Sequence, residues 1–113
     1  MIVRNATRGT LLADRCRLAD SWVSRGIGLL LSAPLAEGEG LRITATSLIT
    51  MVFMRFAIDA VFLDREGRVV KVAERLRPWA LASGARGAAE VVELPAGTVA
   101  RTGTQAGDEV SFE

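Results

Sequence analysis

Two charged residues interrupt the most apolar stretch of this sequence, and their position there is the strongest sign of chemistry in the chain. Arg55 and Asp59 lie within residues 47–64, which are otherwise largely apolar. A charged side chain in such a run must be paired, must accept backbone hydrogen bonds, or must face water. In an unbroken strand the two would lie about 13 Å apart, so a direct pair needs a bend near Phe56 and Ala57. Two interpretations stay open: the groups are structural, or they mark a ligand pocket.

Other kinds of site find little support in the composition. The chain has no His and no Tyr, which excludes imidazole catalysis, His-ligated metals and tyrosine acids. The glycines at 26–28 and 38–40 lack the context of a phosphate-binding loop, and the carboxylates are scattered. We therefore predict no catalytic residue, no metal site and no cofactor.

The single cysteine, Cys16, cannot form an internal disulfide. Strand alternation places it on one face with Leu12 and Leu18, which predicts a buried, inert thiol. The arginines at positions 15 and 17 leave a reactive thiol as the alternative, because neighbouring cations lower a thiol pKa.

Length and charge narrow the class of protein. The chain has 113 residues, half of them hydrophobic, which predicts one domain over residues 1–113. Its formal net charge of +1 argues against a nucleic-acid-binding surface. No stretch approaches the roughly 20 apolar residues of a membrane span, and no apolar segment of secretory length opens the chain. We expect a soluble, cytoplasmic protein.

Short apolar segments between turn signals predict a β-rich domain. A hairpin turn is expected at residues 64–67, because Asp-Arg-Glu-Gly joins two strand-like runs. An amphipathic helix is expected from an N-cap at Asp20 to Leu31, and a helical turn from Pro95 to Arg101. Strands are expected at residues 1–4, 10–17, 41–45, 68–76, 88–94 and 109–113, with two more in 47–64 that break near 55–58.

No strand–helix–strand alternation is visible, which argues against a doubly wound sheet. The fold class we predict is mainly β: an antiparallel β sandwich or small barrel with one or two short helices.

Residues 54–70 resemble the central signature of the bacterial and archaeal domain-of-unknown-function family 192. Further matches occur in the same order as in that family. They are Arg25 with Gly28, Leu29, Leu30 and Leu35; residues 39–41; the Pro78–Trp79 pair; residues 93–97; and Gly103 with Gly107 and Asp108. The resemblance spans almost the whole chain and implies a jelly-roll-like β sandwich. It implies no established activity.

The sequence departs from the family pattern at three places. Thr50 and Met51 stand where His-Thr is commoner, Ala57 stands where Pro is commoner, and Leu31–Ser32 stand where an Arg often follows. Two of these changes remove a polar or charged group. If those groups line a family site, this chain carries a changed version of it.

The leading hypothesis is a non-catalytic domain that binds a small ligand or a peptide near Arg55 and Asp59. Arg55 would supply planar donors to an anionic group, and Asp59 would orient it. Arg25, Met54 and Thr50 are further candidate ligand-binding residues, through the motifs in which they lie. The alternatives are an enzyme with Asp59 as general base, and an interaction module that pairs a sheet edge with a partner strand.

Overall fold

The computed structural model describes residues 1–21, 24–25, 33–52 and 54–113. Among them about 46% lie in strands and 7% in helices, which confirms a mainly β protein. The elements are β1 (Val3–Asn5), β2 (Thr10–Ala13), β3 (Arg15–Ala19), β4 (Glu39–Thr44), β5 (Leu48–Ile49), β6 (Ile58–Leu63), β7 (Val69–Leu76), β8 (Ser83–Gly84), β9 (Glu90–Pro95), α2 (Thr98–Thr102) and β10 (Val110–Phe112).

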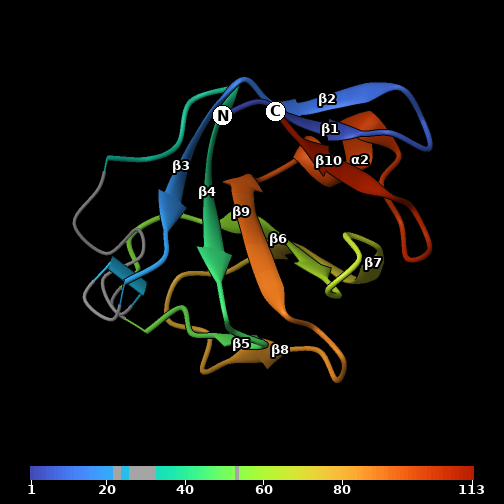
Figure 1. The fold of residues 1–113 in the computed structure, drawn as a ribbon. Helices are drawn as coiled ribbons and strands as arrows, with labels where there is room; N and C mark the ends of the chain where they lie inside the picture. Colours follow the sequence, from blue (N-terminus) through green and yellow to red (C-terminus); the bar gives the residue numbers. More distant parts are fainter. Residues whose placement is uncertain (22–23, 26–32, 53) are drawn as a thin grey trace.

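The described strands form three sheets. The largest has the order β3-β4-β9-β6-β7, a second has the order β10-β1-β2, and β5 pairs with β8 alone. Figure 1 places the small sheet and α2 at one end of the molecule, and β5 with β8 at the other. The termini meet, since Ile2 and Glu113 exchange two backbone hydrogen bonds. No helix of the described residues is long and apolar enough to cross a membrane.

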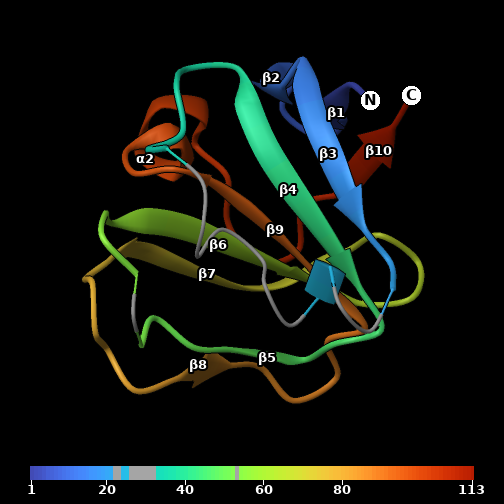
Figure 2. The ribbon, with the colours of Figure 1, turned by 90° about the vertical axis from the view of Figure 1, so that its left-hand side faces the viewer.

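The five-stranded sheet carries a hydrophobic cluster on each face. Cluster 1 packs against the small sheet and α2, and cluster 2 lies on the opposite face. Strand β6 contributes to both, which is why all six of its residues are buried. Cluster 2 includes Met51 and Met54 from the segment that joins β5 to β6 (Figure 2).

One strand pair contradicts the antiparallel expectation. Strands β3 and β4 run parallel, while the remaining neighbours in this sheet are antiparallel. Parallel neighbours need a long crossover, and residues 20–38 provide it. The length of that connection was the signal in the sequence for this arrangement.

The strand expected over residues 10–17 is in fact two strands. Strand β2 pairs with β1 in the small sheet, whereas β3 pairs with β4 in the large one. The chain changes sheets at Asp14, where the N–H groups of Asp14 and Arg15 both donate to the Gly38 carbonyl at 2.9 Å. Leu12 and Cys16 are both buried in cluster 1, as expected, but Leu18 is 45% exposed, because it lies further along β3, beside Arg42 on β4.

The turn expected at residues 64–67 is confirmed as the β6–β7 hairpin. The Asp64 carboxylate accepts hydrogen bonds from the N–H groups of Glu66 (2.9 Å) and Arg68 (2.8 Å). Gly67 has a φ of 82°, and a Cβ there would lie 2.9 Å from the Val110 carbonyl oxygen. Glycine is therefore required by both conformation and space.

The helix expected at 20–31 falls mostly outside the described residues, but its start is visible. Ser21 and Ser24 cap each other: the Ser21 N–H donates to Ser24 Oγ, and the Ser24 N–H donates to Ser21 Oγ. Arg25 N–H donates to the Ser21 carbonyl. The cap is therefore Ser21 and not Asp20, because its hydroxyl reaches the third residue of the turn.

The C-terminal elements are held by a polar cluster around Asp108. Its carboxylate accepts hydrogen bonds from Asn5 Nδ2 (2.9 Å), Arg8 Nε (2.8 Å) and Gln105 N–H (3.0 Å). Burial by itself would raise the pKa of Asp108, but the bonds from Arg8 and Asn5 outweigh it and lower that pKa. The small sheet is thereby tied to the turn that precedes β10.

We expect Cys16 to be inert in the folded protein. It is buried in cluster 1, and burial raises the pKa of its thiol, so little thiolate is present at neutral pH. A colorimetric thiol reagent should show no stoichiometric labelling within minutes in buffer, and full labelling in denaturant. Rapid labelling without denaturant would contradict this assignment.

Candidate functional site

Asp59 is fully buried, and its carboxylate collects three backbone N–H groups. Oδ1 accepts from Arg75 at 2.8 Å, and Oδ2 accepts from Gly97 at 3.1 Å and Val99 at 2.8 Å. One side chain therefore joins the centre of the sheet to β7 and to the start of α2. Of the structural roles considered from the sequence, a carboxylate that caps loop amides is the one observed.

The backbone at Arg75 and at Gly97 has a left-handed conformation, and both residues donate an N–H group to Asp59. Strand β7 has an extra residue opposite β6 between Ala73 and Leu76, and Arg75 there has a φ of 51°. Gly97 occupies the N-cap position of α2 with a φ of 100° and brings no side-chain cap of its own. Asp59 supplies that cap from β6, since the Val99 N–H is one of the donors that a helix start leaves unsatisfied.

Arg55 has the opposite environment. Its side chain is exposed and makes no hydrogen bond or ion pair with the residues that the structure describes. The two charged residues of the apolar run therefore do not pair. Asp59 points to the cluster 1 side of the sheet, and Arg55 lies on the segment before β6.

The remaining candidates divide between two segments. Thr50 and Met54 share the segment of Arg55: Thr50 Oγ1 donates to the Leu81 carbonyl at 2.6 Å, and Met54 is buried in cluster 2. Arg25 lies on the turn that begins at Ser21, where its Nη1 donates to the Asp20 carbonyl at 2.7 Å. The structure thus groups Thr50, Met54 and Arg55, with Asp59 and Arg25 on other segments.

The segment of Thr50 forms one side of an exposed ribbon, which we call the β5–β8 ribbon and define as residues 47–52 and 79–84. Met51 exchanges backbone hydrogen bonds with this second segment, its N–H donating to Ala80 and its carbonyl accepting from Trp79. Leu48, Trp79 and Leu81 are exposed to 59%, 57% and 83%. Trp79 also has a φ of 69°, a left-handed backbone that a bulky residue rarely adopts.

The charged residues within and next to the two segments of this ribbon are all arginines. Residues 47–57 and 77–87 contain Arg55, Arg77 and Arg86 and no Asp or Glu, although the whole chain has a net charge of only +1. All three arginines are exposed. Exposed apolar side chains and exposed cationic side chains therefore occur in the same two chain segments.

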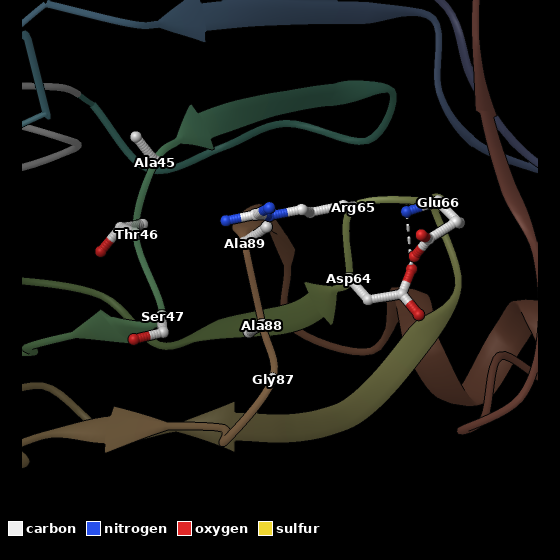
Figure 3. A pocket seen from close by; sticks show the side chains of 9 residues that line it. All are labelled: Ala45, Thr46, Ser47, Asp64, Arg65, Glu66, Gly87, Ala88 and Ala89. Carbon is white, nitrogen blue, oxygen red and sulfur yellow. Dashed lines mark hydrogen bonds between the residues drawn. The ribbon is translucent and has the colours of Figure 1, made fainter.

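A separate cleft of about 720 Å³ lies at the far end of the β6–β7 hairpin. Figure 3 shows Arg65 extended across it, from the hairpin toward Thr46 and Ala89. Asp64 and Glu66 also line it, yet no group of three or more Cys, Asp or Glu in the described parts of the chain could hold a metal ion. The lining residues are Ala45, Thr46, Ser47, Asp64, Arg65, Glu66, Gly87, Ala88 and Ala89.

Glu93 on β9 is a buried carboxylate that the sequence reasoning missed. It is 6% exposed, and within the described residues it has no hydrogen-bond or ion-pair partner. Burial raises its pKa to about 7. The signal was present in the sequence, because Glu93 interrupts the apolar run Val91–Leu94 just as Asp59 interrupts its own.

We expect Asp59→Ala to lower the free energy of unfolding by about 3–5 kcal/mol, because it leaves three buried N–H groups without an acceptor. Arg55→Ala should stay within about 0.5 kcal/mol of the parent, because the side chain is exposed and has no partner among the residues that the structure describes. Urea midpoints of the two variants and of the double variant measure this. Equal, strongly coupled losses at both positions would show that the two residues act as a pair.

Glu93 should make the folded state less stable as the pH rises. The folded chain holds this proton up to about pH 7, whereas the unfolded chain releases it near its usual value of 4.5. Between about pH 4.5 and pH 7 the folded state binds more protons at Glu93 than the unfolded state does. The free energy of unfolding therefore falls as the pH rises across this range, and the fall is complete above about pH 7. The loss amounts to about 3 kcal/mol.

Denaturant midpoints between about pH 5.5 and pH 8 test this, and Glu93→Gln should flatten the profile relative to the parent. The exposed Glu74 on β7 provides the matched control, as Glu74→Gln should leave the slope unchanged. Parallel profiles for the parent and Glu93→Gln would contradict the assignment.

The sequence of this chain is similar to those of two UPF0127 proteins. The chain is 31% identical to a UPF0127 protein of Thermococcus sibiricus, over 96% of this chain and 73% of that protein. It is 30% identical to a UPF0127 protein of Pyrococcus furiosus, over 96% of this chain and 95% of that one.

Two solved structures share the fold. One is a protein of unknown function from Novosphingobium aromaticivorans, with a TM-score of 0.86, 24% identity, and coverage of 98% of this chain and 83% of that one. The other, from Sinorhizobium meliloti, is described as a candidate transcription regulator and has a TM-score of 0.83 at 25% identity, covering 97% of this chain and 89% of that one. The sequence profile of DUF192, described as an uncharacterized ACR family, matches residues 3–112. The chain belongs to the DUF192 family.

Proposed function

We propose that residues 1–113 form one non-catalytic binding domain, built as a small β sandwich, that holds an extended acidic peptide on the β5–β8 ribbon. The observation that carries this is the exposure of Leu48, Trp79 and Leu81 on a ribbon whose own and adjoining residues, 47–57 and 77–87, include three arginines and no Asp or Glu. Large apolar side chains that gather on a surface are typical of an interaction site.

Along both segments of the ribbon, exposed side chains alternate with buried or half-buried ones, and this alternation suits an extended partner. Ile49 is buried while Leu48 and Thr50 are exposed, and on the second segment Trp79 and Leu81 are separated by the half-buried Ala80. Alternate residues of an extended peptide also lie about 6.6 Å apart, so its apolar side chains match this spacing. Trp and Arg are the side chains that most often dominate the binding energy of such surfaces.

The three arginines favour an acidic peptide as the partner. Arg55, Arg77 and Arg86 favour carboxylates in the partner, and no acidic side chain in these segments would repel them. Arg55 keeps the role that its sequence context suggested, as a donor to an anionic group. Thr50 holds the two segments together through its bond to Leu81, and Met54 packs beneath them.

Asp59 has a supporting role in this proposal. Both of its oxygens already accept N–H groups, and its side chain is fully buried, which argues against a general base that must reach a substrate proton. It keeps β6 in place, and the segment of Arg55 leads directly into that strand.

Fluorescence anisotropy with two labelled peptides tests the proposal. One alternates Glu with Leu, and the other alternates Lys with Leu. We expect the acidic peptide to bind at least about tenfold more tightly, a difference of about 1.4 kcal/mol. Leu81→Ser and Trp79→Ser should each weaken its binding by a similar factor, and Arg55→Gln with Arg77→Gln should reduce the salt dependence.

Leu18→Ser is the matched control, because Leu18 is also an exposed leucine but lies on β3. It should bind the acidic peptide as the parent does. Equal affinity for both peptides, or equal losses from Leu18→Ser and Leu81→Ser, would overturn the proposal.

A further inference from the structure

The cleft of Figure 3 is lined by three segments of the chain, and backbone hydrogen bonds hold these segments together. The segments are residues 45–47 before β5, residues 64–66 in the β6–β7 hairpin, and residues 87–89 before β9. The Thr46 N–H donates to the Ala89 carbonyl at 3.1 Å, and the Ala89 N–H donates to the carbonyl of Leu63, at the end of β6, at 2.7 Å. The fold therefore sets the shape of the cleft before a ligand arrives, which lowers the entropic cost of binding.

Arg65 is the cationic side chain of this cleft, and its guanidinium is available to a ligand. In Figure 3 it extends toward Thr46 and Ala89, away from the carboxylates of Asp64 and Glu66. It forms no ion pair or side-chain hydrogen bond with the residues that the structure describes. A guanidinium in this state can donate two parallel hydrogen bonds to one carboxylate.

The same cleft offers oxygen atoms that can accept hydrogen bonds from a ligand. Asp64 uses Oδ1 to accept from two N–H groups of its own hairpin, and its Oδ2 has no partner among the described residues. The Glu66 carboxylate and the Ser47 hydroxyl also have no partner in that part of the chain. None of the described residues that line the cleft is aromatic. This lining favours a ligand with hydroxyl groups over an apolar ring.

Small residues keep the rest of the wall open. Ala45, Gly87, Ala88 and Ala89 carry at most a methyl group, and the volume of about 720 Å³ lies within the usual range for small-molecule sites. Ala45 has a φ of 54°, a left-handed backbone that alanine rarely adopts. Backbone strain of this kind persists where the surrounding structure enforces it, and it concentrates at ligand sites.

We propose that this cleft is a second binding site, for a small hydroxylated monocarboxylate with the chemistry of a sugar acid. Arg65 donates to the carboxylate, and Glu66 and Asp64 Oδ2 accept hydrogen bonds from the hydroxyl groups. The lining has one arginine against two acids, so a ligand with a single negative charge suits it better than a doubly charged phosphate ester.

Calorimetric titration with three linear six-carbon probes tests the site. Gluconate has the carboxylate and the hydroxyls, hexanoate has only the carboxylate, and sorbitol has only hydroxyls. We expect gluconate to bind at least about tenfold more tightly than either of the others. Arg65→Gln should weaken gluconate by about tenfold and leave sorbitol unchanged, whereas Glu66→Ala should weaken gluconate and leave hexanoate no weaker.

The control is Arg68→Gln, which removes another exposed arginine of the same hairpin that does not line the cleft. It should bind gluconate as the parent does, and so should Leu81→Ser, which separates this site from the β5–β8 ribbon. Thermal unfolding confirms that each variant is folded, since all of these side chains are exposed.

Three results would overturn the proposal. The first is no saturable binding of gluconate by the parent up to about 10 mM. The second is equal affinity of the parent for gluconate and hexanoate. The third is an Arg65→Gln variant that binds gluconate as the parent does, or that loses no more affinity than Arg68→Gln.

Discussion

The Asp59 carboxylate is the interaction on which the other elements depend. Its three N–H donors come from positions 16, 38 and 40 residues further along the chain. Each bond to an ionised acceptor in a buried setting is stronger than a neutral one, and each donor would be costly to leave unsatisfied. The irregular stretch of β7, the left-handed Gly97 and the start of α2 each bring an N–H group to this one carboxylate.

Glu93, on the neighbouring strand β9, shows how a buried acidic side chain behaves when no N–H group of the described residues donates to it. Asp59 pairs with Leu94 and Ala60 pairs with Glu93, so the two acids lie one position apart and face opposite sides of the sheet. Asp59 meets turn and helix N–H groups on the cluster 1 side. Glu93 meets apolar side chains on the cluster 2 side, and its pKa rises to about 7. Asp59 joins three elements of the fold, whereas Glu93 has no hydrogen-bond partner among the described residues.

The arginines also differ in role: some form short ion pairs, and others are exposed beside the β5–β8 ribbon. Arg8 and Arg42 are committed to Asp108 and Glu90 in short ion pairs that tie strands and turns together. Arg55 and Arg77 adjoin the β5–β8 ribbon, in segments that contain no Asp or Glu. Both side chains are exposed, and the peptide proposed above would meet them there.

Much of the local structure could be read from the sequence alone. The Asp64–Gly67 hairpin, the break within residues 47–64, the turn after Pro95 and the buried Cys16 depend on short-range preferences for turn residues and on apolar runs. The sequence left the role of Asp59 open between a structural group and a ligand-binding group, because its three donors lie 16 to 40 residues away. The parallel β3–β4 pair, the sheet change at Asp14, the exposure of Leu18 and the isolation of Glu93 were decided by the tertiary structure. Each depends on which distant strand lies alongside, and alternation along one strand does not specify its neighbour.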